Sequence, residues 1–236
     1  MTQTVVIAGV GPGLGESLAR KFASEGCQVG LFARSIEYLE ELAGDIRKQG
    51  GEALPVKVDL TNPGDVEQGF NSVRENYGTI DTLIHHASYA AWKGLLDITG
   101  NEFERSWRVT TFGGFLCAQE VVPGMLEQGE GTIIFTGATS AVKGSAYGLA
   151  FSSAKFGVRG MAQSLARDLG PKGIHVAHVI IDGQIDTPIV RERLPDREEH
   201  TFLNPDAIAE TYWHLANQDR SAWSLEVDVR PHVEEF

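Results

Sequence analysis

The sequence predicts a single-domain α/β protein in which a doubly wound parallel sheet of about seven strands carries helices on both faces. Short apolar runs rich in Val and Ile alternate with amphipathic helical segments along the whole chain. A glycine-rich turn joins the first apolar run to the first helical segment. The length of 236 residues suits one domain, and no repeat, low-complexity tract or linker divides residues 1–236.

Each element has a local signal. A strand is expected where a β-branched run is bounded by turn residues, and a helix where apolar residues recur at helical spacing behind a cap such as Asn62-Pro63. The expected strands are residues 4–9, 28–33, 53–58, 80–85, 132–136, 174–181 and 224–229. The expected helices are residues 16–25, a segment that starts at Ser35, 62–77, 101–128, a segment that includes Phe151 and ends at Leu169, and 204–217.

The composition excludes several classes of function. With 20 Lys and Arg against 32 Asp and Glu, the net charge is -12, and no basic cluster is available for a nucleic acid. No apolar run reaches membrane-spanning length and no basic leader precedes the first strand, so we expect a cytoplasmic protein with no membrane partner. Cys27 and Cys117 stand in apolar surroundings and are expected to be reduced core residues. No Cys, His and Asp spacing predicts a metal site.

The glycine-rich turn, residues 9–15, has the pattern of a phosphate-binding loop. Its glycines let the backbone turn tightly and approach a pyrophosphate, and the helix behind them offers free N–H groups and the positive end of its dipole. The loop follows the first strand and opens the first helix, which is the context that this mechanism requires. The alternative is a tight turn that binds nothing.

In this loop and along most of its length, the chain resembles the short-chain dehydrogenase/reductase family. The family motif Thr-Gly-x-x-x-Gly-x-Gly is matched by residues 8–15, with Ala8 in place of the Thr. Residues 85–88 stand where the family has Asn-Asn-Ala-Gly, and residues 181–188 resemble the loop after its sixth strand. The resemblance implies a nicotinamide dinucleotide held by Gly9, Gly13, Leu14, Gly15, Asp59, Leu60, Ala87, Lys155 and Gly183, with Ile185 and Thr187 on the nicotinamide side.

The end of the second expected strand bears on the choice of cofactor. An acidic side chain there would bind the ribose hydroxyls of NAD. This chain has Arg34, and a guanidinium suits the 2′-phosphate of NADP through charge-assisted contacts. NADP is therefore expected, with NAD the less favoured cofactor. The alternative is a solvated arginine at the start of a helix.

The family's four catalytic side chains are largely replaced. The resemblance places its Tyr, the general acid and base, at Phe151, and its Lys at Lys155. Its Ser falls at Ala138 and its Asn at Thr110, so one of four matches. Loss of a positioned general acid typically costs ~10²- to 10⁴-fold in rate. Reduction of a carbonyl by the family's usual route is expected to be badly impaired, whereas Lys155 still has ribose hydroxyls to bind.

Three nearby side chains carry hydroxyl groups. Tyr147 lies one helical turn before Phe151 and shares its face if the helix already extends there. A packing or specificity role is the alternative for Tyr147, and hydrogen bonds at a turn are the alternative for Thr139 and Ser140. His85 and His86 end the fourth expected strand, where they are expected to point to opposite faces and to pack near the adenine.

Two functions fit these residues. The first is an NADP(H)-dependent oxidoreductase with a modified proton path, acting on a small carbonyl, alcohol or enone, where water or Tyr147 supplies the proton. The second is a catalytically silent protein that binds the nucleotide as a sensor or an assembly subunit. Residues 191–204, whose first part (191–200) is highly charged and expected to be mobile, are expected to form a lid over the substrate.

The resemblance also implies a homodimer or homotetramer through the two long helices, residues 101–128 and 151–169. Ala154, Gly157, Gly160 and Ala162 are small enough for close contact between helices. The alternative is that these small residues pack against the chain's own sheet.

Overall fold

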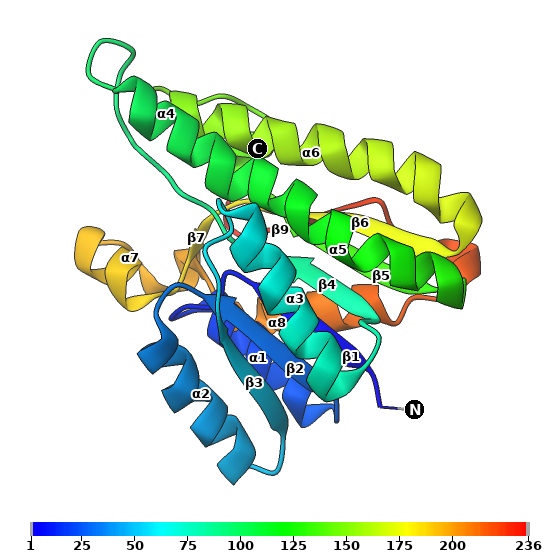
Figure 1. Ribbon diagram of the computed structural model, residues 1–236. Coiled ribbons are helices and arrows are strands. Elements are labelled where there is room, and N and C mark those ends of the chain that lie inside the picture. Colours follow the sequence, from blue (N-terminus) through cyan, green and yellow to red (C-terminus); the bar gives the residue numbers. More distant parts are fainter. Residues whose placement is uncertain (1, 235–236) are drawn as a thin grey trace.

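A seven-stranded parallel sheet forms the centre of the protein, as predicted (Figure 1). The computed structural model describes residues 2–234. In spatial order the strands are β3 (Glu52–Lys57), β2 (Gln28–Ala33), β1 (Thr4–Ala8), β4 (Thr82–His85), β5 (Gly131–Thr136), β6 (Ile174–Ile181) and β9 (Glu226–Val229).

The central strands are apolar because helices cover both of their faces. All five residues of β1 and all eight of β6 are buried, which explains why these strands read as continuous β-branched runs. The chain leaves β1 for β2 on one side and later returns to place β4 on the other, with Ile7 paired to Leu31 and to Ile84. The connections that leave the carboxyl ends of β1 and β4 therefore run in opposite directions, and ligands of such sheets bind in the crevice at this switch point.

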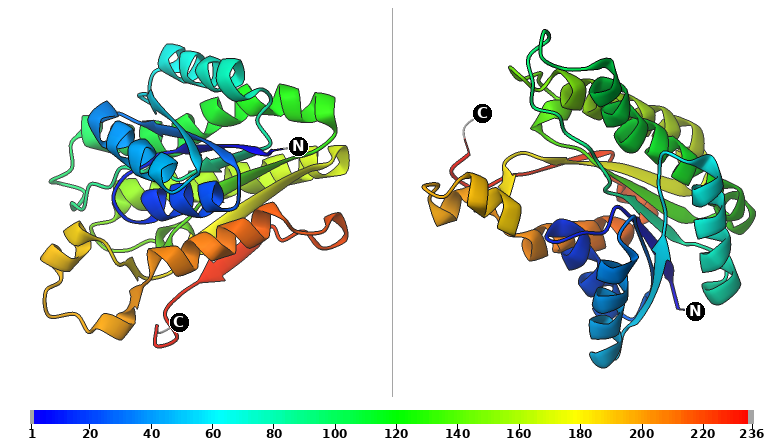
Figure 2. Two further views of the ribbon diagram at one scale, coloured as in Figure 1. Left: turned by 90° about the horizontal axis from the view of Figure 1, so that it is seen from below. Right: turned by 60° about the vertical axis from the view of Figure 1, so that its left-hand side comes forward.

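Two layers of helices enclose the sheet (Figures 1 and 2). One apolar cluster joins the sheet to α1 (Leu14–Ser24), α2 (Ile36–Lys48) and α8 (Pro205–Ala216). A second cluster joins the opposite face to α3 (Pro63–Tyr77), α5 (Gly113–Gln128) and α6 (Leu149–Leu169). Cys27 and Cys117 are buried, one in each cluster, and form no disulfide, which confirms their prediction as core residues.

The helix expected at residues 101–128 is interrupted by a π-helical turn. Helix α4 (Gly100–Trp107) passes into this turn (Arg108–Phe112) and then into α5. The hydroxyl of Thr111 donates to the carbonyl oxygen of Ala154 on α6 at 2.8 Å. A Cβ at Gly157 would lie 2.9 Å from the same hydroxyl oxygen, so the turn packs directly on α6. Such π-helical turns frequently occur at functional sites.

The small residues of α6 mostly pack inside the chain. Ala154 and Ala162 are fully buried, and Gly157 contacts the π-helical turn. Gly160 is the exception, because nothing lies near the position of its missing side chain. Three of the four thus pack within the chain, although Gly157 packs on the π-helical turn and not on the sheet that the alternative named.

The segment after β6 contains more regular secondary structure than the high charge of residues 191–200 led us to expect. It forms β7 (Gln184–Ile185), α7 (Pro188–Arg193), a 3-10 turn (Glu199–Thr201) and β8 (Phe202–Leu203), which pairs with β7. Within residues 2–234, no helix combines the length and the apolarity that crossing a membrane requires.

Candidate active site

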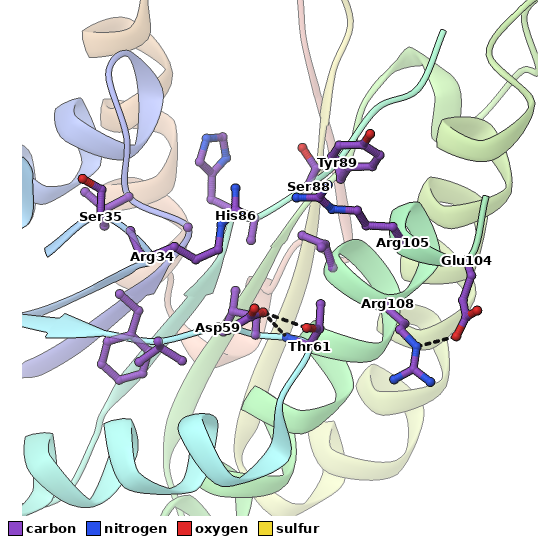
Figure 3. Close-up of a pocket in the computed structure, with 18 of the residues that line it drawn as sticks. Arg34, Ser35, Asp59, Thr61, His86, Ser88, Tyr89, Glu104, Arg105 and Arg108 are labelled. Atoms are coloured by element: carbon purple, nitrogen blue, oxygen red, sulfur yellow. Dashed lines mark hydrogen bonds and ion pairs between the residues drawn. The ribbon is translucent and has the colours of Figure 1, made fainter. Parts of the chain in front are cut away.

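A pocket of about 920 Å³ opens at the carboxyl ends of β1, β2, β3 and β4 (Figure 3). It therefore occupies the crevice that the topology predicts. Its lining residues are Gly9, Val10, Phe32, Ala33, Arg34, Ser35, Val58, Asp59, Leu60, Thr61, His86, Ala87, Ser88, Tyr89, Asn101, Glu104, Arg105, Arg108 and Val109.

The glycine loop brings the ends of β1 and β4 into contact. Gly9 has a φ of 107°, and a Cβ there would lie 2.4 Å from the amide nitrogen of Ala87. Gly13 has a φ of 102°, precedes α1 and would place a Cβ 2.4 Å from Cγ2 of Thr187. Leu14 begins α1. The loop thus leaves backbone N–H groups and a helix N-terminus open beside the pocket, an arrangement that fits a pyrophosphate.

Asp59 forms the floor of the pocket. Its Oδ1 accepts hydrogen bonds from the backbone N–H of Thr61 at 2.9 Å and from the Thr61 hydroxyl at 2.7 Å. Burial opposes the carboxylate, but these bonds and the positive charges of Arg34 and Arg105 lower its pKa below the usual range. Asp59 is therefore ionised and can accept hydrogen bonds from a ligand in the pocket. An amino group such as that of an adenine needs an acceptor of this kind.

A second wall of the pocket comes from α4. The guanidinium of Arg105 lies over the ring of Tyr89, with 4.5 Å between its Cζ and the ring centroid. Arg108 is held by Glu104, whose Oε1 lies 2.6 Å from its Nε. With these arginines, the pocket lining has more cationic than anionic side chains, although the chain as a whole is acidic.

His85, the last residue of β4, and His86, which follows it, point to different environments, and His86 alone of the two lines the pocket. His85 is 1% exposed and its Nε2 lies 2.8 Å from the carbonyl oxygen of Thr110 in the π-helical turn. His86 lines the pocket, and its Nδ1 lies 3.3 Å from the Thr136 hydroxyl oxygen. Burial lowers the pKa of His85 to about 4 and that of His86 to about 3, with the charge of Lys155 acting in the same direction. Both rings are therefore neutral at neutral pH.

Lys155 sits deep beside the carboxyl end of β5. It is 2% exposed, and its Nζ donates to the carbonyl oxygen of Thr136 at 2.7 Å. Its Nζ also lies 5.5 Å from the ring centroid of Phe151, one turn earlier on α6. Burial lowers the pKa of Lys155 to about 7, since no carboxylate compensates for the lost hydration.

Ala138, at the expected Ser position, has no hydroxyl group. Ala138 is in an extended conformation and precedes a 3-10 turn (Thr139–Ala141). The hydroxyl of Thr139 donates to Oδ1 of Asp182 at 2.5 Å, so its hydrogen is already engaged. Asp182 is buried at the end of β6, and its Oδ2 lies 3.4 Å from a guanidinium nitrogen of Arg230. The Thr139 hydroxyl is thus engaged by a residue distant in the chain, and not by the local turn hydrogen bond that was the alternative for it.

Tyr147 does not share a helical face with Phe151. Helix α6 begins at Leu149 with Gly148 as its N-cap, and Tyr147 precedes it with a φ of 60°. Its side chain is 68% exposed. The condition under which Tyr147 would share that face is not met, because the backbone at Tyr147 is left-handed and α6 begins two residues later. Trp92 instead covers Phe151, with 5.4 Å between the ring centroids.

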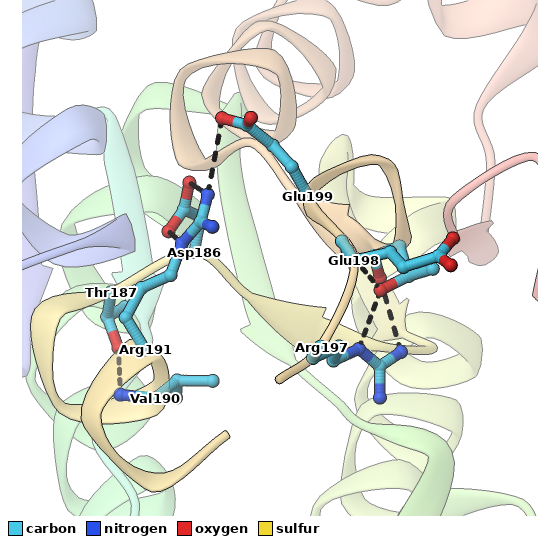
Figure 4. Close-up of polar contacts among 8 residues, drawn as sticks. Asp186, Thr187, Val190, Arg191, Arg197, Glu198 and Glu199 are labelled. Carbon is cyan, nitrogen blue, oxygen red and sulfur yellow. Dashed lines mark hydrogen bonds and ion pairs between the residues drawn. The ribbon is translucent and has the colours of Figure 1, made fainter. Parts of the chain in front are cut away.

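The loop after β6 is held in place by local polar contacts. Arg191 lies between Asp186 and Glu199 and binds both carboxylate oxygens of Asp186, at 2.6 and 2.8 Å (Figure 4). The hydroxyl of Thr187 accepts from the backbone N–H of Val190 and caps α7. Of the residues expected to bind the cofactor, Gly13, Leu14, Gly15, Lys155, Gly183, Ile185 and Thr187 lie outside the pocket lining.

The fold and the loop match a known family. The family model for the short chain dehydrogenase matches residues 3–198. The chain belongs to this family. The sorbitol-6-phosphate 2-dehydrogenase of Escherichia coli (strain K12) is 31% identical over 215 residues, which are 90% of this chain and 83% of the relative. An uncharacterized oxidoreductase of Bacillus subtilis (strain 168) is 28% identical over 208 residues, 88% of this chain and 80% of the relative.

Solved structures of short-chain dehydrogenases share the same architecture. A short-chain dehydrogenase from Rhodopseudomonas palustris superposes with a TM-score of 0.85 at 35% identity, covering 98% of this chain and 99% of that one. A metagenomic short-chain oxidoreductase in complex with NADP gives a TM-score of 0.84 at 25% identity, covering 98% of each chain. The chain is therefore an oxidoreductase of the short-chain dehydrogenase type.

Several residues of this short-chain dehydrogenase site carried no signal in the sequence. Trp92 and Tyr89 lie in an irregular loop, and Arg105 lies among other charged residues of an exposed helix. Asp182 lies in the loop that resembles the family's, but its pairing with Thr139 has no signal in the sequence. Each gains its place through contacts with residues distant in the chain, which spacing rules do not address.

Proposed function

We propose that the protein is an NADP(H)-dependent oxidoreductase with an altered catalytic tetrad, acting on a small carbonyl, alcohol or enone. One observation carries this proposal. The glycine loop and Lys155 keep the geometry of a dinucleotide site, whereas Phe151 and Ala138 place no hydroxyl beside it. The protein thus retains what positions a nicotinamide and lacks the usual acid.

The residues present fit the dinucleotide along its whole length. Gly9, Gly13, Leu14 and Gly15 surround the pyrophosphate, and Arg34 binds the 2′-phosphate. Asp59, Leu60 and Ala87 hold the adenosine, while Gly183, Ile185 and Thr187 approach the nicotinamide from the loop after β6. When bound, the nicotinamide exchanges a hydride with the substrate carbon.

Lys155 holds the nicotinamide ribose in this proposal. Its Nζ has one acceptor, the Thr136 carbonyl, and therefore two remaining hydrogens for ribose hydroxyls. The π-helical turn supports the same region, because the Thr110 carbonyl fixes His85 and the Thr110 hydroxyl accepts from the backbone N–H of Tyr89 at 3.3 Å. Thr110 is thus a positioning residue.

The substrate that suits this site is an enone. Reduction of a conjugated double bond places its proton on carbon after hydride transfer, so the enzyme does not need an acid fixed at a carbonyl oxygen. The wall above Phe151 is aromatic, since Trp92 packs on it and is itself 53% exposed. Water reaches this wall, and we assign to water the proton that is added to the substrate carbon. The Tyr147 hydroxyl is the alternative donor.

Two further features belong to the same proposal. Residues 191–204 act as the lid, which Arg191 anchors through its contacts with Asp186 and Glu199. Two or four copies associate through α4, α5 and α6, where Trp107 and Phe115 are exposed and stack through Phe112. Reduced, buried cysteines support a cytoplasmic location.

The test measures binding and turnover separately. NADPH is titrated while tryptophan fluorescence is followed, and its oxidation is then followed with enones and ketones. Sorbitol 6-phosphate, the alcohol named for a relative, is tested separately with NADP⁺, whose reduction is followed. Binding of NADPH with turnover of an enone is expected. Binding without turnover on any panel member would favour a silent nucleotide-binding protein, and absence of binding would overturn the proposal.

A further inference from the structure

Two guanidinium groups enter the pocket from opposite walls. Arg34 extends from the end of β2 and Arg105 from α4, with Asp59 between and below them (Figure 3). Within residues 2–234, neither arginine forms an ion pair with a neighbouring carboxylate. Glu104, the acidic residue next to Arg105, is engaged by Arg108. The charge of Arg105 is therefore open to a ligand.

Arg105 is held in one orientation by its packing. Its Cζ lies over the Tyr89 ring, 4.5 Å from the ring centroid, which is within the range of a cation–π contact. Tyr89 is itself fixed to α4 and the π-helical turn. Its carbonyl oxygen accepts from the Ser106 hydroxyl at 2.6 Å, and its backbone N–H donates to the Thr110 hydroxyl at 3.3 Å. The guanidinium plane is thus positioned before any ligand arrives.

We propose that Arg105 forms one face of the base-binding site, with Tyr89 against one side of its guanidinium and the adenine ring of the dinucleotide against the other. This inference rests on the proposed function, because it assumes that the pocket takes the adenosine half of the cofactor. A purine stacks on a guanidinium plane as it does on an aromatic ring. Asp59 accepts from the exocyclic amino group at the edge of the same base.

The division of labour between the two arginines follows from their places. Arg34 is exposed beside Ser35 at the start of α2, where a phosphate on the ribose has access to its donors. Arg105 lies across the pocket. One face of its guanidinium packs on the Tyr89 ring, so the other face is available to a ligand. Arg34 distinguishes NADP from NAD, whereas Arg105 binds the part that both cofactors share.

The experiment uses ligands that separate the base from the 2′-phosphate. Binding of ADP and of adenosine 2′,5′-bisphosphate is measured by calorimetry for the wild-type protein and for Arg105→Leu, Arg105→Lys and Arg34→Leu. Loss of a base-stacking contact at an exposed site is expected to raise both dissociation constants about five- to tenfold in Arg105→Leu. Arg105→Lys keeps the charge but not the plane, so it should resemble Arg105→Leu.

Two controls keep the outcomes distinct. Arg167→Leu removes an exposed arginine from α6, whose guanidinium donates to the Gln163 carbonyl far from the pocket lining, and should bind both ligands as the wild type does. Arg34→Leu should weaken only the bisphosphate. The inference is overturned if Arg105→Leu weakens only the bisphosphate, if Arg105→Lys behaves as the wild type, or if neither variant differs. If the wild-type protein binds neither ligand, the proposed function itself fails.

Discussion

The ammonium group of Lys155 donates to the carbonyl oxygen of Thr136 at 2.7 Å in a site where Lys155 is 2% exposed. Burial lowers the pKa of this lysine to about 7 from 10.5 in the unfolded chain. The unfolded chain therefore binds more protons between these two values, and the free energy of unfolding rises with pH across this window. The stabilisation is complete above the unfolded pKa and is lost as pH falls to about 7.

This relationship predicts the pH dependence of the nucleotide-free protein. The wild-type melting temperature should rise relative to that of Lys155→Met as the pH is raised from 7 toward 9.5, a window set by the pKa of about 7. Calorimetric scans of both proteins in matched buffers measure the difference. A constant difference across this range would show that Lys155 keeps an ordinary pKa in the folded protein.

Restoring the two missing hydroxyls should restore carbonyl reduction. In the variant Ala138→Ser with Phe151→Tyr, the new phenol stands next to Lys155, whose Nζ lies 5.5 Å from the present Phe151 ring. A positioned general acid contributes about 10²- to 10⁴-fold, so a gain in kcat/KM of at least about tenfold on a ketone is expected. NADPH oxidation measures it. The single change Ala138→Ser is the control and should gain little, while no gain in the double variant would show that the site geometry has diverged.

The elements and their order followed from local sequence signals. Asn62 and Asn204 accept from the backbone N–H groups of Gly64 and Asp206, as caps followed by Pro indicate. The π-helical turn was not predictable, because it depends on the fit of Thr111 against α6. Helical periodicity carries no information on a partner more than 40 residues away, as the Thr111–Ala154 separation of 43 illustrates.

The candidate site was predictable in part for the same reason. The glycine loop could be predicted from the spacing of its glycines, because Gly9 and Gly13 have backbone conformations that few other residues adopt. The pairing of Thr139 with Asp182, by contrast, joins the ends of β5 and β6. The backbone at Tyr147 also escaped prediction, because a left-handed conformation in a tyrosine is uncommon and has no sequence signal.

A methyl group at Gly9 should destabilise the fold even without a cofactor. The residue has a φ of 107°, and the added Cβ would lie 2.4 Å from the Ala87 backbone nitrogen, which is held by its hydrogen bond to the carbonyl oxygen of Ala8 at 2.9 Å. Gly9→Ala should lower the free energy of unfolding by at least about 2 kcal/mol. Gly11→Ala is the matched control, because nothing lies within 4 Å of its missing side chain. Urea denaturation compares the two, and equal midpoints would contradict the prediction.

Arg34 should decide the preference between the two nicotinamide cofactors. Its guanidinium lines the pocket and supplies charge-assisted hydrogen bonds that only a 2′-phosphate accepts. Arg34→Gln should weaken NADPH binding about tenfold or more and should reduce its dependence on salt. NADH binding should change less than about twofold, within the range of a screened surface charge. Fluorescence titrations at low and high salt measure both, and equal losses for the two cofactors would contradict this role.

The last prediction concerns the source of the proton. Tyr147 is 68% exposed on a loop, and its ring lies near Gly94, with 3.6 Å from the position of a Cβ there to the nearest ring atoms. A phenol so placed is surrounded by water that is available for the same transfer. Tyr147→Phe should therefore change kcat for an enone by less than about threefold, far below the effect of removing a positioned acid.

The variant Trp92→Ala distinguishes the loss of a proton donor from the loss of packing at the substrate wall. Trp92 covers the ring of Phe151, so Trp92→Ala should raise KM for an apolar enone while Tyr147→Phe leaves KM unchanged. The solvent isotope effect on kcat should be the same in Tyr147→Phe as in the wild type, since water is the donor in both. A fall in kcat of about tenfold or more in Tyr147→Phe, with KM unchanged, would assign the proton to the Tyr147 hydroxyl instead.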